Sequence, residues 1–183
     1  MLDTIWDQVL TELHKGASQQ KHPFRYTYFT TVDEYHQPFS RTVVLRRVWD
    51  DSPRLWIYTD ERTPKVAHLQ SNPKVSLLFY HPKQLLQVSI RGKCRVIKDE
   101  EIVQTYWNGV RQRSQNDYTT NVAPGTSIAN PDHVSYDYDQ PHFCILEVQP
   151  EEIEYLQLKR PNHIRALFTQ KDSGEWDQTF LVP

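Results

Sequence analysis

The sequence is poor in glycine, with only 5 among 183 residues, and it has no glycine-rich loop. Nucleotide-binding folds of the Rossmann and P-loop types hold phosphates with such loops, so neither fold is indicated. A nucleotide-like ligand would need side chains and a helix N-terminus to hold its phosphate. The chain also lacks a long apolar run and a basic, apolar leader at its start. These absences predict a cytoplasmic protein without a membrane partner.

An excess of charge of either sign is also missing. The 21 Lys and Arg and the 23 Asp and Glu give a formal net charge of -2. General nucleic-acid binders are usually strongly basic, so no nucleic-acid partner is expected. The two cysteines, Cys94 and Cys144, are far apart without metal-type spacing, and we expect two buried free thiols. None of the 8 histidines has the spacing of a metal site, so no metal is expected.

The pattern of apolar residues predicts a mainly β chain with flanking helices, an α+β class. Apolar residues at helical spacing predict an amphipathic helix that ends near Gly16. Two further helices are expected over 64–70 and 99–110, a turn over 50–53, a bulge at Gly92, and a polar loop over 111–140. Strands are expected over 25–32, 41–49, 54–59, 74–80, 85–97, 143–148, 153–158, 164–168 and 180–182. The short connections favour one domain, residues 1–183, folded as an antiparallel barrel with helices over its openings.

The segment around residue 63 has the features of an anion site. Thr63 fits a helix N-cap and Pro64 fits the first helical position. A helix N-terminus combined with a hydroxyl and the Lys65 ammonium suits a phosphate. On the strand expected over 41–49, Arg41 and Arg46 fall on opposite faces by the two-residue period. On spacing alone, an ordinary capped helix and a solvated strand face are an alternative interpretation.

Five segments resemble, in order and spacing, motifs of the pyridoxamine 5′-phosphate oxidase family. Residues 41–46 are similar to its Arg-x-Val-Leu-Leu-Lys strand, 55–59 to its Phe-x-Phe-Tyr-Thr strand and 63–65 to its Ser-Arg-Lys helix start. Residues 72–80 and 87–92 are similar to its Asn-Pro-x-Ala-x-Leu-x-Phe-Tyr and Gln-Val-Arg-Ile-x-Gly strands. The resemblance implies an antiparallel split β-barrel of the FMN-binding type. It also implies FMN as cofactor and a homodimer with FMN at its interface.

The resemblance further implies which residues contact the flavin. They are Arg41, Val43, Val44, Leu45, Arg46, Tyr58, Thr59, Thr63, Lys65, Gln87 and Ser114. Within this set, Thr63, Lys65 and Arg46 are expected to meet at the FMN phosphate. Gln87 is expected to reach the flavin from the partner subunit. Pro64 stands where the family has arginine, and the bidentate guanidinium of Arg46, in place of a family lysine, offsets that loss.

The resemblance departs at the substrate end. His163 and Arg165 match the family's Arg-x-His-x-Arg motif, but Pro161 replaces its first arginine and Tyr155 replaces a tryptophan. A substrate phosphate thereby loses a charge-assisted contact worth about 1.5–3 kcal/mol. We therefore expect an FMN-dependent oxidoreductase related to pyridoxamine 5′-phosphate oxidase, acting on another small molecule, with its catalytic residue unassigned. The alternatives are a flavin-binding module without turnover and a split barrel that binds haem.

Overall fold

The computed structural model describes residues 1–49 and 53–183, so most of the turn expected over 50–53 lies outside the described residues. The strands are β1 (Tyr26–Val32), β2 (Pro38–Val48), β3 (Leu55–Asp60), β4 (Lys74–His81), β5 (Leu86–Val96), β6 (Phe143–Gln157), β7 (Ile164–Gln170) and β8 (Trp176–Leu181). The helices are α1 (Leu2–Ser18), α2 (Pro64–Ser71), α3 (Glu100–Asn108) and α4 (Gln112–Gln115). No helix in the described ranges is both long enough and apolar enough to cross a membrane.

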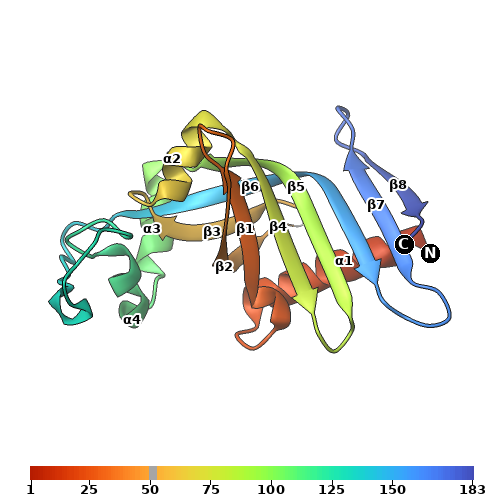
Figure 1. The fold of residues 1–183 in the computed structure, drawn as a ribbon, viewed down its shortest axis with the longest axis horizontal. Helices are drawn as coiled ribbons and strands as arrows, with labels where there is room; N and C mark the ends of the chain where they lie inside the picture. The colour runs from red at the N-terminus through yellow and green to blue at the C-terminus, as the bar shows by residue number, and fades with distance from the viewer. Residues whose placement is uncertain (50–52) are drawn as a thin grey trace.

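Six of these strands close into an antiparallel barrel. The sheet order is β3-β2-β1-β4-β5-β6-β7-β8, and β3 pairs in addition with β6. The closing pairs run from Leu55 opposite Val148 to Asp60 opposite Phe143. Strands β7 and β8 continue the sheet beyond the barrel (Figure 1). The expected mainly β fold, an antiparallel barrel with flanking helices, is confirmed.

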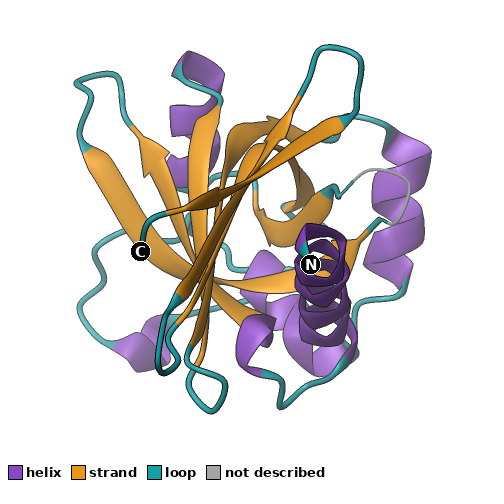
Figure 2. Ribbon diagram, turned by 90° about the vertical axis from the view of Figure 1, so that its right-hand side faces the viewer, coloured by secondary structure: helices purple, strands orange, loops and turns teal. Residues whose placement is uncertain are grey.

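The barrel encloses one large apolar core. Inward residues alternate along the strands, as Phe29 on β1 and Leu77 and Phe79 on β4 show by their complete burial. Helix α1 lies along one end of the barrel and adds Val9 and Leu13 to the core (Figures 1 and 2). Each fully buried side chain of this size contributes about 1.5–3 kcal/mol. The predicted helix is therefore confirmed, although it ends two residues later than expected, at Ser18.

Strand β6 is continuous, although the sequence pattern predicts two strands, 143–148 and 153–158. Proline is normally excluded from a central strand because it cannot donate to the ladder. Here Pro150 pairs with Gly92 of β5, where the register shifts between Arg91 and Gly92. A Cβ at Gly92 would lie 2.1 Å from the Gln149 carbonyl oxygen, so this close approach requires glycine. The predicted bulge at Gly92 is confirmed, and it explains how β6 passes through a proline.

Helix α3 borders a second, smaller aromatic cluster. Its N-cap is Asp99, whose carboxylate accepts the backbone N–H of Ile102 at 3.1 Å. The apolar face expected for this helix is only partly buried, and Ile102 is 36% exposed. The cluster is formed by Trp56, Tyr118, Phe143 and Ile145, with Val103, Tyr106, Trp107 and Val110 packed against it. The following polar segment contains α4 and a bridge between Thr120 and Tyr136.

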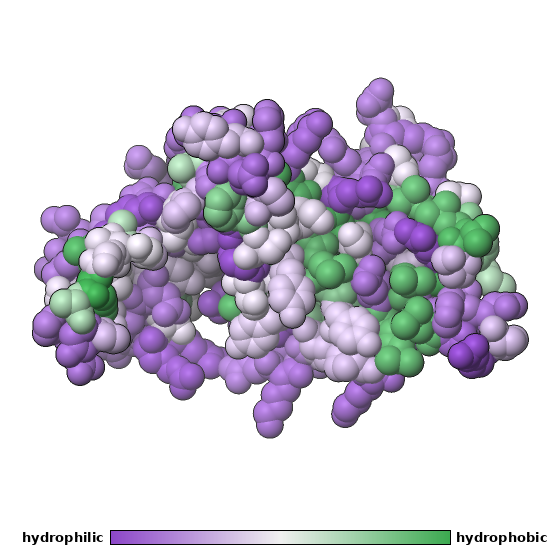
Figure 3. Space-filling model, viewed as in Figure 1, coloured by the Kyte–Doolittle hydropathy of each residue, from purple (hydrophilic) through white to green (hydrophobic). Residues whose placement is uncertain are grey.

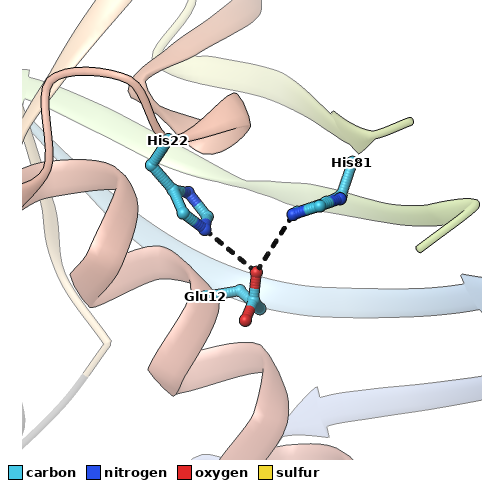
Figure 4. A group of neighbouring side chains, drawn as sticks. All are labelled: Glu12, His22 and His81. Atoms are coloured by element: carbon cyan, nitrogen blue, oxygen red, sulfur yellow. Dashed lines mark hydrogen bonds and ion pairs between the residues drawn. The ribbon is translucent and has the colours of Figure 1, made fainter. Parts of the chain in front are cut away.

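A buried carboxylate fastens α1 to the barrel. Glu12 is 3% exposed, and its Oε2 lies 3.1 Å from Nε2 of His22 and 4.0 Å from Nε2 of His81 (Figure 4). In both rings Nδ1 accepts a backbone N–H, from Phe24 and Gln84 respectively. Nε2 of each ring therefore carries the proton that faces the carboxylate. A metal ion needs that nitrogen deprotonated, so the group is a hydrogen-bonded clamp.

This clamp predicts loss of stability in acid. Burial lowers the pKa of His22 more than Glu12 raises it. Burial raises the pKa of Glu12, but Lys15 and His22 outweigh it and the pKa is lowered overall. The unfolded chain then binds more protons, so the stability from His22 is lost as pH falls below about 6.5, and that from Glu12 below about 4.5.

We expect Tm, followed by circular dichroism, to fall between pH 7 and pH 5, by about 2–4 °C for each kcal/mol lost. His22→Gln should flatten this dependence, because it removes the titrating ring. A Tm that rises on acidification, or an unaltered slope in His22→Gln, would show that the clamp does not control acid stability.

Candidate functional site

The junction between β3 and α2 builds a group of hydroxyls around one ammonium. Lys65 Nζ donates to Thr59 Oγ1 at 2.9 Å, and Thr59 Oγ1 lies 3.4 Å from Thr63 Oγ1. Thr63 is the N-cap residue of α2, as predicted, and Pro64 is the first helical residue. The Thr63 hydroxyl donates to the Asp60 carbonyl oxygen at 2.7 Å instead of capping the helix. The N-terminus of α2 therefore has no side-chain cap.

Arg41 on β2 adds a second positive charge beside this group. Its Nη1 donates to Thr31 Oγ1 at 2.7 Å and to the Phe29 carbonyl oxygen at 3.2 Å. Burial, and then the charge of Arg41, lower the pKa of the Lys65 ammonium. Within the described residues, no carboxylate lies within ion-pair distance of Arg41 or Lys65. The charge of Asp60, which is paired with Arg62, offsets only part of this lowering of the Lys65 pKa. The repulsion that remains between the two cations favours binding of an anion.

Arg46 does not join this group. Tyr58 and Thr59 are neighbours on β3 and so point to opposite faces of the sheet. The Arg46 guanidinium lies 5.5 Å from the ring centroid of Tyr58, whereas Lys65 bonds to Thr59. The expected meeting of Thr63, Lys65 and Arg46 at one phosphate is therefore wrong for Arg46. The predicted opposition of Arg41 and Arg46 across the strand accounts for the separation.

Arg46 instead lines a cationic cavity of about 670 Å³. Its buried Nε has no hydrogen-bond partner in the described part of the chain. The basic residues in the wall are Lys21, Arg25, Arg46, Arg111 and Arg113. Burial, and then Arg46 and Arg111, lower the pKa of Arg25. The predicted residues Val44, Tyr58 and Ser114 also line this cavity, while Arg25 belongs to no motif and could not be found from spacing.

Tyr58 stays protonated beside these cations. Burial, more than any neighbouring charge, raises the pKa of its phenol to about 12. The hydroxyl is therefore a hydrogen-bond donor at neutral pH. Leu45, by contrast, is fully buried in the barrel core, so only its backbone is available to a ligand.

Of the remaining predicted residues, Val43 packs against the barrel core, Gln87 and Arg165 lie on the outer face of the sheet, and His163 lies in the loop before β7. Gln87 of β5 pairs with Leu156 of β6, which pairs with Arg165 of β7. Arg165 is held by Glu154, with Nη2 3.1 Å from Oε1. His163 Nδ1 accepts the backbone N–H of Lys159 at 3.1 Å, which fixes the loop before β7.

These outer-face residues are far from the Arg41 and Lys65 group. Around the closed barrel, β5 and β7 each lie three strand spacings from β2, about 14 Å along the sheet at ~4.8 Å per spacing. Exposed tyrosines on β1 and β4 and apolar side chains over β4 to β7 cover this face (Figure 3). The structure thus divides the predicted site into three sets of residues, which are the Arg41 and Lys65 group, the residues of the cationic cavity and the outer-face residues.

The two cysteines are buried and free, as predicted. Burial raises the pKa of both thiols, to about 12 for Cys144. Both line a cleft of about 950 Å³ between α2 and α3, away from the cationic cavity. A thiol with so high a pKa is a poor nucleophile, so neither is a candidate catalytic residue.

Comparison with known proteins identifies relatives of this chain in sequence and in fold. A relative in Arabidopsis thaliana named pyridoxine/pyridoxamine 5′-phosphate oxidase 2 is 28% identical over 181 residues, which cover 92% of this chain and 90% of its own. A solved pyridoxamine 5′-phosphate oxidase-related, FMN-binding protein of Nostoc punctiforme has a TM-score of 0.81 at 22% identity, covering 97% and 96% of the two chains. PhzG from Burkholderia lata, solved with tetrahydrophenazine-1-carboxylic acid, has a TM-score of 0.76 at 15% identity, covering 99% and 92%.

At these identities the solved structures establish the fold. The sequence model described as pyridoxamine 5′-phosphate oxidase, FMN-binding domain, matches residues 3–98, just over half of the chain. This protein therefore belongs to the pyridoxamine 5′-phosphate oxidase family of FMN-binding proteins.

Proposed function

We propose that this protein is an FMN-dependent oxidoreductase that holds the flavin phosphate between Arg41 and Lys65. The observation that carries the proposal is this pair of adjacent cations without a carboxylate partner, beside the hydroxyls of Thr59 and Thr63. A phosphate monoester supplies the missing negative charge and accepts from the ammonium, the guanidinium and the Thr59 hydroxyl, since the Thr63 hydroxyl already donates to the Asp60 carbonyl oxygen. The uncapped N-terminus of α2 adds a favourable dipole at the same place. The donor set therefore fits FMN.

The rest of the cofactor is proposed to lie along β2. Val43, Val44 and the backbone of Leu45 would border the ring and ribityl chain, with Tyr58 beside them. Support comes from the cavity wall, which includes Val44, Tyr58 and Ser114. Bound FMN supplies hydride-accepting chemistry at its ring. The residues of this chain bind and orient it and its substrate.

We propose a homodimer in which a second copy contributes Gln87 to each flavin and His163 and Arg165 to the substrate side of the same site. In one chain Gln87 and Arg165 lie on the outer face of strands about 14 Å along the sheet from β2, which separates them from Arg41. A second copy placed against the outer face removes this distance. The exposed rings of Tyr26, Tyr28 and Tyr80 on the same face are typical of an interface. A cytoplasmic location and a single domain over residues 1–183 stay predictions.

The cationic cavity is proposed to receive an anionic group of the substrate. It adjoins Val44 and Tyr58, and its basic residues outnumber its one acidic residue, Asp117. The unpartnered Nε of Arg46 and the Tyr58 hydroxyl are donors available to a carboxylate or phosphate. Removal of the anion leaves Arg25, Arg46 and Arg111 in mutual repulsion, which favours its binding.

Purified protein is expected to be yellow and to release FMN on denaturation. The Arabidopsis relative is named after pyridoxamine 5′-phosphate, which is therefore the substrate to test. Under anaerobic conditions it should bleach the flavin of the wild-type chain about ten- to hundredfold more slowly than that of a Pro161→Arg variant. The reason is that the wild-type chain lacks one charge-assisted contact to the substrate phosphate. Stopped-flow absorbance at the flavin band measures both rates. Equal rates would show that the substrate site is not altered at this position. A haem absorption band, or a colourless protein without affinity for FMN, would contradict the proposal itself.

A further inference from the structure

Arg41 is held in place by the Thr31 hydroxyl and the Phe29 carbonyl oxygen, at 3.2 Å, rather than by a carboxylate. Its Nη1 donates to Thr31 Oγ1 at 2.7 Å, and Thr31 Oγ1 lies 2.9 Å from Nδ1 of His68. Because the Thr31 oxygen accepts from the guanidinium, its own proton is free to be donated to Nδ1. The three groups then form a directed chain from Arg41 through Thr31 to His68. Thr31 is fully buried, so no water competes for its hydroxyl.

His68 is well placed to anchor this chain. It lies three residues after Lys65 on α2, and residues at this spacing share one face of a helix. One face of α2 thus presents the ammonium to the proposed phosphate site and the imidazole to the hydroxyl behind Arg41. The ring of Phe39 on β2 lies 5.1 Å from the His68 ring, at a tilt of 51°, and packs against it.

We propose that Thr31 and His68 are positioning residues, a relay that aims the Arg41 guanidinium at the phosphate of the flavin. The inference rests on the proposed FMN site. Arg41 has several rotatable bonds and would lose conformational freedom on binding phosphate. The relay orders the side chain beforehand, and preorganisation of this kind increases affinity. Its effect must be confined to ligands that carry the phosphate, because neither residue is proposed to touch the flavin ring.

The test compares FMN with riboflavin, which has the same ring but no phosphate. Dissociation constants are measured by quenching of flavin fluorescence. Thr31→Val keeps the shape but removes the hydroxyl, and His68→Phe keeps a ring against Phe39 but removes the acceptor. Each is expected to weaken FMN binding by up to about tenfold and to leave riboflavin binding unchanged. Thr31→Ser and His68→Asn, which restore a donor and an acceptor, should bind FMN as the wild-type chain does.

The double variant Thr31→Val/His68→Phe should bind FMN no more weakly than either single variant, because either change alone breaks the chain. Additive losses, or equal losses of FMN and riboflavin, would overturn the relay and indicate a general structural role. Unchanged FMN binding in both single variants would overturn it as well. A wild-type chain that binds FMN no better than riboflavin would overturn the phosphate site and the relay together.

Discussion

Replacing Lys65 with alanine is expected to raise the FMN dissociation constant about ten- to hundredfold, because a charge-assisted hydrogen bond contributes about 1.5–3 kcal/mol. The ammonium is one of only two charges that we place at the phosphate, and its present partner is a neutral hydroxyl, that of Thr59. Its loss leaves Arg41 to compensate the phosphate alone. Fluorescence titration of the apoprotein with FMN measures the change.

The matched control is the same substitution at Lys171, an exposed residue of the β7–β8 turn paired with Asp177 at 2.7 Å. Lys171→Ala should bind FMN as the wild-type chain does, since an exposed ion pair contributes little. Lys65→Arg keeps a positive charge and should recover part of the affinity. If Lys65→Ala and Lys171→Ala bind FMN equally well, Lys65 does not hold the phosphate.

The sequence predicts well those features, such as strands and helix ends, that depend on residues close together along the chain. Period-two alternation located most of the strands, although it divided β6 in two and placed the last strand over 180–182 instead of Trp176–Leu181. The Thr63-Pro64 pair located the start of α2 to the residue. The family motifs also lie in these local segments, which is why the order of matched strands was informative. Such patterns report which residues face inward, because burial imposes the periodicity.

Contacts between distant segments could not be read in this way. The closure of β3 on β6 joins segments more than 80 residues apart, and the passage of β6 through Pro150 depends on Gly92, a residue of another strand. The relay joins Thr31 to His68, and the clamp joins Glu12 to His22 and His81, which no spacing rule connects.

The misplacement of Arg46 has a related cause. The motif match put Arg46 near the flavin phosphate, but alternation along β2 turns it away from Arg41. The register of β2 against β3 also shifts between Leu45 and Arg47, so its pairing there is irregular. The cavity that it lines also includes Arg25, which precedes β1, and Arg111, which follows α3, and no motif connects these segments. The sequence therefore predicts the cofactor better than it predicts the substrate site.

The division of the site between two copies of the chain predicts complementation. We consider one chain with Lys65→Ala and a second chain with both Gln87→Ala and Arg165→Ala. Each variant alone is expected to bind FMN weakly, because every site in its dimer lacks one set of contacts. In a dimer of one chain of each kind, each site takes Lys65 from one chain and Gln87 and Arg165 from the other. One site therefore carries all three substitutions, and the other carries none. Random exchange makes half of the dimers mixed, so about a quarter of all sites should be intact.

The most direct measurement is therefore an FMN titration of the two variants after they are unfolded together and refolded as a mixture. We predict that about a quarter of the sites bind FMN with wild-type affinity, while each variant refolded alone shows none. A mixture that binds FMN only as the average of its two separate components would contradict a flavin site shared between two chains.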